Sequence, residues 1–172
     1  MDDTEKLTGM VCAGRGKASL RLEKYKEELE HYFQNSPHPG SFNLVISKPV
    51  ALNYDSVIIF GSDQRAFWPI IVNNLPCLIY RWHKCPLHVL EIVSDVNLRK
   101  YLGVKDGNIV KIQIPKESQV SLDAMQHFLW LTLWRYRESW YYKRNCYTQT
   151  IKRIPLLNYL YHQKVCQNID KY

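Results

Sequence analysis

The sequence predicts a mainly β protein: a small six-stranded barrel with one or two short helices, followed by an α-helical extension at the C-terminus. Six or more short apolar segments are separated by turn residues at close spacing, which favours a barrel over a doubly wound sheet. After Pro115 the apolar residues recur three and four positions apart, which indicates helices. We therefore expect a barrel domain over residues 1–116 and a basic, aromatic, helical extension over residues 117–172.

The first elements are predicted to be a hairpin and a helix. Residues 7–12 form a short apolar segment, and residues 18–22 alternate in polarity. Two such segments around the glycines of residues 14–16 favour a pair of strands. Residues 24–34 carry aromatic and apolar side chains at helical spacing, and the Pro and Gly residues of 35–40 end that helix.

The middle of the chain supplies most of the predicted barrel. Asn73 and Asn74 separate two apolar segments, and Asn tolerates the positive φ of a tight hairpin. Residues 97–101 are expected to form a single helical turn, and residues 105–108 a turn before the last strand. The strands predicted here are residues 42–46, 57–60, 67–72, 75–80, 89–93 and 109–114.

The last third predicts two helical segments. Ser121 is a suitable N-cap, and Asp123 would lie in the first turn, where the helix dipole favours an acid. The amphipathic helix that follows extends over roughly 20 residues. Its apolar stripe consists of Leu122, Met125, Leu129, Leu133, Tyr136 and Trp140. A second basic, aromatic segment spans residues 150–166.

Positive charge is concentrated in the last third. Residues 1–119 hold 15 Lys and Arg against 13 Asp and Glu, a balance of +2, whereas residues 120–172 hold 8 against 3, a balance of +5. A basic segment that also carries Trp130, Trp134 and Trp140 suggests a phosphate-rich partner: a membrane surface, a nucleic acid or an acidic protein. A solvated basic face above a packed aromatic face explains the same pattern.

The sequence predicts a cytoplasmic protein. No apolar run approaches the ~20 residues that span a bilayer, and residues 1–6 lack the basic start and apolar stretch of a secretory signal. The five cysteines are an odd number without metal-ligand spacing, which predicts free thiols and argues against a zinc site. The basic last third adds peripheral contact with the inner face of the membrane as an expectation.

Two short motifs suggest nucleotide chemistry. The first is Gly14-Arg15-Gly16-Lys17-Ala18, whose glycines would let backbone amides approach phosphates while Arg and Lys add positive charge. This motif is neither a Walker loop nor a Rossmann fingerprint, and glycine turns of this kind are common.

The second motif is Pro39-Gly40-Ser41-Phe42-Asn43. Ser41 and Asn43 are two positions apart at a strand start, so both side chains point to one face. A hydroxyl and an amide oxygen suit Mg²⁺, which takes its remaining ligands from water and phosphates. In the alternative interpretation, both side chains satisfy backbone groups of a turn.

Three further positions are candidates for chemistry. Glu91 interrupts an apolar strand and is either exposed or held for function. Arg99 could bind a phosphate or pair with a surface acid. His83 and His88 lie in the segment that precedes the strand of Glu91; a catalytic role is one hypothesis for them, and a structural or solvated role is the other.

The order of these motifs resembles the archaeal-type CTP-dependent riboflavin kinases over about residues 7–114. The segment containing Ser41 and Asn43 is similar to that family's GTLN motif, and the stretch from Leu90 to Gly107 is similar as well. The resemblance implies a cradle-loop β-barrel that transfers the γ-phosphoryl group of CTP to a primary hydroxyl. It implies CTP contacts at Arg15, Gly16, Lys17, Ala18, Ser19, Arg99, Lys100, Tyr101 and Leu102, Mg²⁺ ligands at Ser41 and Asn43, and an acceptor-side acid at Glu91.

The acceptor side departs from the family pattern. The segment 82–88 after Arg81 is shorter than the family's and lacks its hydroxyl residue. The first hypothesis is therefore a Mg²⁺- and CTP-dependent kinase acting on riboflavin or on another alcohol such as a sugar or lipid precursor. The second is a non-catalytic barrel module that docks to a membrane surface or partner protein through its basic C-terminal helices. A nucleic-acid partner is less favoured, and the oligomeric state is left open.

Overall fold

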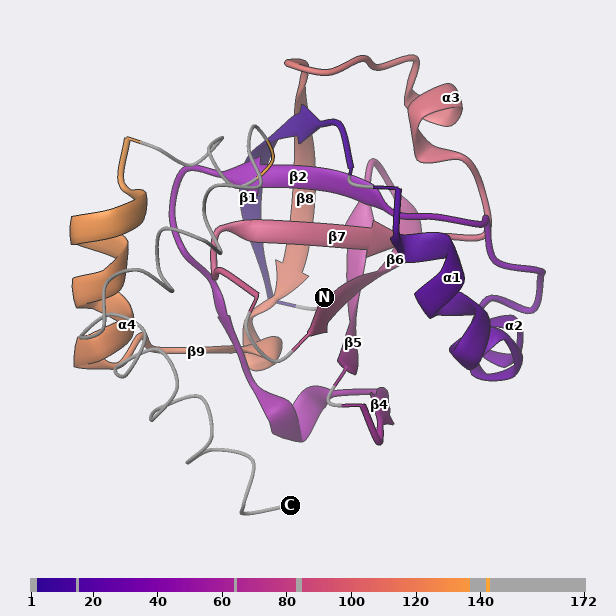
Figure 1. The fold of residues 1–172 in the computed structure, drawn as a ribbon, viewed down its shortest axis with the longest axis horizontal. Helices are drawn as coiled ribbons and strands as arrows, with labels where there is room; N and C mark the ends of the chain where they lie inside the picture. Colours follow the sequence, from indigo (N-terminus) through magenta and orange to yellow (C-terminus); the bar gives the residue numbers. More distant parts are fainter. Residues whose placement is uncertain (1–2, 15, 64, 83–84, 137–141, 143–172) are drawn as a thin grey trace. The chain divides into compact units, whose positions relative to one another are not determined.

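The computed structural model describes residues 3–14, 16–63, 65–82, 85–136 and 142 (Figure 1). The barrel and the helix after it belong to one compact unit, Met1–Glu138. A second unit, Ser139–Tyr172, lies outside the described residues apart from Tyr142. The predicted domain boundary after residue 116 stays a prediction.

A closed antiparallel barrel forms the body of the first unit, which confirms the predicted fold class. Six strands follow the order β5–β6–β7–β2–β1–β8, and β8 pairs with β5 to close the ring, while β4 extends the sheet beyond β5 (Figure 1). The strands are β1 (Thr4–Cys12), β2 (Phe42–Ile46), β4 (Ile59–Gly61), β5 (Arg65–Val72), β6 (Leu75–Trp82), β7 (Val89–Val93) and β8 (Ile109–Pro115).

Apolar side chains pack on both faces of this sheet because successive residues of a strand point to opposite sides. One set fills the barrel and includes Val11, Leu44, Trp68, Ile79, Ile92 and Ile112. A second, smaller cluster lies on the outer face under the first helices and consists of Leu22, Tyr25, Leu29, Phe67, Leu78, Tyr80 and Val93. All five residues of β2 are buried for this reason.

The hairpin between β5 and β6 confirms the prediction made from its two asparagines. Asn73 and Asn74 adopt φ of 48° and 66°, the left-handed conformation that a two-residue turn of this kind requires. The predicted strands 42–46, 89–93 and 109–114 are confirmed too, the last with one more residue.

The predicted strand at residues 18–22 is wrong, because this segment is the helix α1. Alternation would place Ala18, Leu20 and Leu22 on one face, whereas the helix places Ala18 and Leu22 on the outer cluster and leaves Leu20 81% exposed. The helix prediction for residues 24–34 is confirmed in substance. The helices here are α1 (Ala18–Leu22), the 3-10 turn η1 (Glu23–Tyr25) and α2 (Lys26–Phe33).

Several short elements connect the long strands of the barrel. The predicted strand at 57–60 begins two residues later, as β4, after the 3-10 turn η2 (Tyr54–Ser56). A ribbon of two-residue strands, β3 (Ala51–Leu52) with β9 (Gln119–Val120), was not predicted. The predicted helical turn at 97–101 is confirmed as α3 (Leu98–Leu102). The 3-10 turn η3 (Lys116–Ser118) leads into β9.

The C-terminal helix starts at a different residue from the one predicted. Asp123, and not Ser121, is the N-cap of α4 (Ala124–Leu129), because its carboxylate accepts from Gln126 N at 2.8 Å while Gln126 Oε1 accepts from Asp123 N at 3.0 Å. The π-helical turn η4 (Trp130–Trp134) follows directly. The predicted helix of roughly 20 residues is too long, because the helical run ends at Trp134 and Tyr136 has a φ of 67°. The predicted stripe is also wrong in part: Trp130 and Trp134 are the buried side chains, whereas Tyr136 is 81% exposed. Trp140 and the segment 150–166 fall outside the described residues. None of the helices described is long and apolar enough to cross a bilayer.

Candidate functional site

A lateral row of side chains crosses the outer face of the barrel and contains two of the predicted site residues. The strand registers pair Cys12 with Asn43, Asn43 with Glu91, and Glu91 with Tyr80. Directly paired residues of antiparallel strands project from the same face. Tyr80 belongs to the outer cluster, so Asn43 and Glu91 lie on that face as well.

The glycine turn after β1 lies directly against Asn43. A Cβ atom at Gly14 would lie 2.4 Å from Asn43 Nδ2, closer than any side chain tolerates, so only glycine lets the backbone pass here. Gly16 has a φ of 68°, which also favours glycine. The predicted phosphate-binding turn and the predicted metal ligand are therefore in contact.

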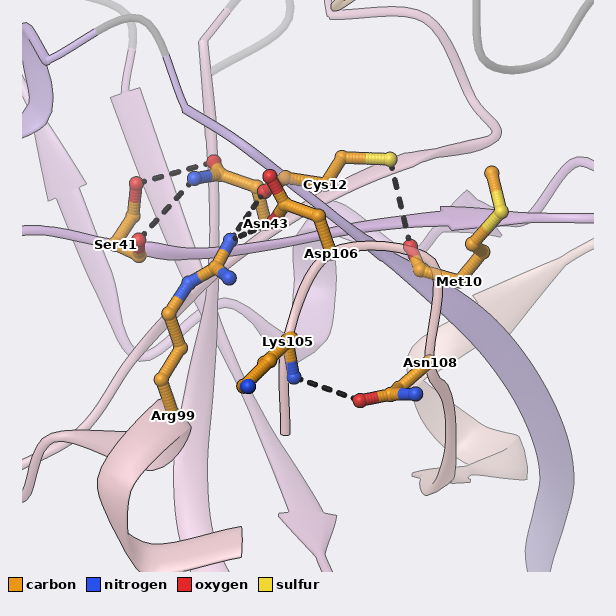
Figure 2. A network of polar contacts seen from close by, with 8 residues as sticks. All are labelled: Met10, Cys12, Ser41, Asn43, Arg99, Lys105, Asp106 and Asn108. Carbon is orange, nitrogen blue, oxygen red and sulfur yellow. Dashed lines mark hydrogen bonds and ion pairs between the residues drawn. The ribbon is translucent and has the colours of Figure 1, made fainter. Parts of the chain in front are cut away.

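Ser41 and Asn43 present two oxygen atoms close together. Ser41 Oγ donates to Asn43 Oδ1 at 3.2 Å, and Asn43 Nδ2 donates to the Ser41 carbonyl at 3.2 Å, which turns the amide oxygen toward the hydroxyl (Figure 2). Neutral oxygens of this kind fit Mg²⁺ when phosphates supply further ligands. Within the described part of the chain, no three His, Cys, Asp or Glu side chains converge to hold a metal ion.

Arg99 of α3 lies beside the end of β1, next to the pair of Cys12 and Asn43. Its Nη2 donates to the carbonyl of Cys12, the residue paired with Asn43, at 2.8 Å and forms an ion pair with Asp106 Oδ1 at 2.7 Å (Figure 2). Asn97 caps the start of α3 by accepting from Lys100 N at 3.1 Å. The guanidinium therefore lies at the end of β1, where the glycine turn begins.

The remaining predicted nucleotide contacts divide into accessible and packed positions. Lys17 and Ser19 are exposed beside the turn, whereas Ala18 packs against the outer cluster. Arg15 lies outside the described residues.

In α3, Lys100 and Tyr101 are exposed, the latter by 56%. Leu102 packs against the barrel core, so its side chain serves the fold.

A polar network next to Glu91 escaped the sequence prediction. Asp63 accepts from the Tyr25 hydroxyl and forms an ion pair with Arg65, and Arg65 Nε donates to the Tyr80 hydroxyl at 2.7 Å. Tyr80 is the residue paired with Glu91. The sequence offers only weak signals for this network, because its members come from η1, the β4–β5 turn, β5 and β6.

Burial and neighbouring charges shift the pKa values of this network. Burial raises the pKa of the Tyr25 phenol, and the hydrogen bond to Asp63 raises it further. Burial also raises the pKa of Tyr80; Arg65 opposes this effect, and Glu91 adds to it. The pKa of Asp63 is lowered, because Tyr25 and Arg65 together outweigh its own desolvation.

The segment between β6 and β7 is fixed by a buried arginine. Arg81, 6% exposed, donates to the carbonyls of Val50 at 2.8 Å and Leu87 at 2.9 Å. The extension helix is defined as α4 together with η4, residues 124–134. His88 is fully buried, and its ring packs against Trp134 of this helix, which indicates a structural role. His83 lies outside the described residues, so its hypothesised role stays a hypothesis.

Comparison with known proteins gives one consistent result. The model of the CTP-dependent riboflavin kinase family, described as a domain of unknown function, DUF120, matches residues 10–114. A riboflavin kinase of Methanoregula boonei is 29% identical over 126 residues, covering 63% of this chain and 56% of that protein. The riboflavin kinase of Thermococcus kodakarensis is 29% identical over 122 residues, covering 63% and 58%.

A riboflavin kinase of Staphylothermus marinus is 29% identical over 131 residues, covering 67% of this chain and 96% of that protein. The chain thus spans little more than half the length of the first two relatives and nearly all of the third.

Proposed function

Because this chain belongs to the CTP-dependent riboflavin kinase family, we propose that it transfers the γ-phosphoryl group of CTP to the primary hydroxyl of riboflavin. The observation that carries the proposal is the convergence of separate segments on one site. Gly14 contacts Asn43, Asn43 is paired with Glu91, and Arg99 binds the carbonyl at the end of β1.

The nucleotide half of the proposed site is formed by the glycine turn and α3. Backbone amides of the turn approach the phosphates of CTP, and the side chains of Lys17 and Arg99 add positive charge. Arg99 is held by the Cys12 carbonyl and Asp106, so little of its freedom is left to lose on binding. Lys100 and Tyr101 are exposed beside it for further contacts.

Ser41 Oγ and Asn43 Oδ1 are the proposed Mg²⁺ ligands. Their two oxygens are 3.2 Å apart and are oriented by a second hydrogen bond from the Asn43 amide. When bound, Mg²⁺ would neutralise charge on the phosphates, which is a large part of what phosphoryl transfer requires.

Glu91 is the proposed acceptor-side group. The bond between the γ-phosphorus and the β–γ bridging oxygen breaks as a bond to the acceptor oxygen forms, giving CDP and a phosphate ester. The Glu91 carboxylate positions the acceptor hydroxyl and takes its proton. Its pairing with both Asn43 and Tyr80 places it between the proposed metal ligands and the Tyr80–Arg65 network.

We expect Mg·CTP to stabilise the protein against thermal unfolding more than Mg·ATP does. A ligand that binds only the folded state at a hundredfold excess over its dissociation constant adds ~2.7 kcal/mol, or roughly 5 to 10 °C for a chain of this size. A thermal-shift panel of the four ribonucleotides measures this directly, with magnesium-free samples as the control. Absence of a shift with every nucleotide would contradict the kinase proposal.

The substitution Asn43→Ala is expected to remove the magnesium-dependent part of the CTP shift, because it deletes one of the two oxygen ligands. The readout is the difference between the CTP shifts with and without Mg²⁺ in the variant and in the natural chain. Asn35→Ala, at an exposed asparagine after α2, is the matched control. An unchanged magnesium dependence in Asn43→Ala would remove Asn43 from the proposed metal site.

A further inference from the structure

His88 joins the extension helix to the barrel. It is the last residue before β7 and is fully buried. Its ring centroid lies 4.5 Å from that of Trp134 and 5.6 Å from that of Trp130, with tilted ring planes. Both distances are within the range of favourable aromatic contacts.

The backbone of the pre-β7 segment, defined as residues 85–88, is fixed to the barrel on its other side. The His88 carbonyl accepts from Ile46 N at 2.9 Å, and the Leu87 carbonyl accepts from Val50 N at 3.0 Å. Arg81 also donates to the Leu87 carbonyl. The pre-β7 segment is therefore held by hydrogen bonds from the barrel and, through the His88 ring, by the two tryptophans.

The two faces of the extension helix differ in their exposure to solvent. Trp130 and Trp134 are 8% and 6% exposed, whereas Phe128 and Leu131 on the same helix are 49% and 44% exposed. Arg135 N donates to the Trp130 carbonyl at 2.9 Å, which closes the π-helical turn that carries both tryptophans. The helix is thus anchored to the barrel at His88 through its tryptophan face.

His88 is linked to Glu91 by the chain of β7 itself, and to the glycine turn and Arg99 only through β2 and β1. Glu91 follows three residues later in β7, about 10 Å along the strand. Arg81, which holds the pre-β7 segment, directly follows Tyr80, the partner of Glu91 in β6. The glycine turn and Arg99 lie instead at the end of β1, which is paired with the first residues of β2.

We propose that Trp130 and Trp134 are positioning residues for acceptor binding: they hold the pre-β7 segment through His88 and so set the place of β7 and Glu91. This inference rests on the proposed function, since it concerns the acceptor half of that site. It gives the extension helix a larger role in affinity for the acceptor alcohol than in affinity for Mg·CTP, whose phosphates are bound chiefly by the glycine turn and Arg99 in the proposed site.

The test is Trp134→Ala in the full chain, with dissociation constants measured for riboflavin by fluorescence and for Mg·CTP by calorimetry. We expect riboflavin binding to weaken by about tenfold or more, and Mg·CTP binding to change by less than about twofold. Trp134→Phe should restore most of the riboflavin affinity, because a ring is kept against His88. Leu131→Ala, on the exposed face, is the control. Equal loss of both ligands, or no loss of either, would overturn the inference.

Amide hydrogen exchange supplies a readout that does not need the proposed activity. The amides of Ile46 and Val50, which donate to the pre-β7 segment, should exchange faster in Trp134→Ala. On the nucleotide side, the Val11 amide donates to the Asn108 carbonyl and the Gly107 amide donates to the Val11 carbonyl. These two amides should keep their exchange rates. If the natural chain binds no riboflavin, the proposed function fails, and the positioning role of the tryptophans is judged from hydrogen exchange alone. Faster exchange of the Ile46 and Val50 amides in Trp134→Ala supports that role. Unchanged exchange rates reject it.

Discussion

At the scale of single residues, Asp63 connects the helical segment to the barrel. Its carboxylate accepts from Tyr25 of η1 and pairs with Arg65 of β5, which in turn donates to Tyr80. The Tyr25 hydroxyl lies over Gly61, where a Cβ atom would be only 2.0 Å away. One acid therefore holds Arg65, which in turn donates to Tyr80, the strand partner of Glu91.

The substitution Asp63→Asn should lower stability at pH 7 by about 1 to 3 kcal/mol, because Arg65 loses its ion-pair partner and an NH2 group replaces one of the two acceptor oxygens. The pKa of Asp63 is lowered in the folded chain, so its contribution is complete above the unfolded value near 3.9 and is lost as pH falls through the folded value. Urea unfolding at pH 7 and pH 3 checks this expectation.

The natural chain should lose more stability than Asp63→Asn between these two pH values. Glu28→Gln, an exposed acid on α2, controls for the removal of one negative charge. Equal losses in the natural chain and Asp63→Asn would show that Asp63 contributes no folded-state pKa shift.

Residues in local motifs could be predicted, whereas residues that meet only through the fold could not. Ser41 and Asn43 were expected on one face from their spacing, and they are hydrogen-bonded to each other. The roles of these residues in metal binding stay predictions. Asp63 and Arg65 lie at a strand boundary with no pattern around them, and their meeting with Tyr25 depends on how η1 packs on the barrel.

At the scale of elements, long alternating strands were predicted well, and short or mixed segments were not. The hairpin of β5 and β6 has a recognisable turn and eight residues in each strand. The segment 18–22 fits both a strand and a helix over five residues, and packing on the outer cluster decides for the helix.

Two residues are too few to show the alternation of apolar and polar side chains that predicts a strand, so β3 and β9 could not be predicted. The start of α4 was missed for another reason. Ser121 and Asp123 are both good N-caps, and Gln126 selects Asp123 because it lies at the position that completes a capping box.

At the scale of the whole molecule, the order of the motifs predicted the family and the barrel, while the place of the extension helix could not be predicted. The predicted apolar stripe omitted Trp130 and Trp134, the two side chains that are buried, and no stripe identifies the partner of a buried face. In the structure that partner includes His88, which the sequence had suggested only as a loop histidine. The basic residues 143–172 lie outside the described residues, so contact with a membrane surface stays a prediction.

A chain ended after residue 116 should be less stable than one ended after residue 136 by at least about 3 kcal/mol, the typical cost of losing one buried Trp. The shorter chain loses β9, the partner of β3, and both tryptophans that cover His88. Denaturant unfolding and light scattering of the two truncated chains provide the comparison. Equal midpoints and equal solubility would mean that the extension helix does not support the barrel.

The pairing of β1 with β8 also sets the order in which the barrel can form. Thr4 is paired with Pro115, so the two partners are separated by 111 positions along the chain. The β5–β6 hairpin needs only a two-residue turn and can form early. Contacts between distant segments close slowly, because the loop entropy is lost before the contact forms. A growing chain must therefore wait for its eighth strand to leave the ribosome before its first strand finds both neighbours.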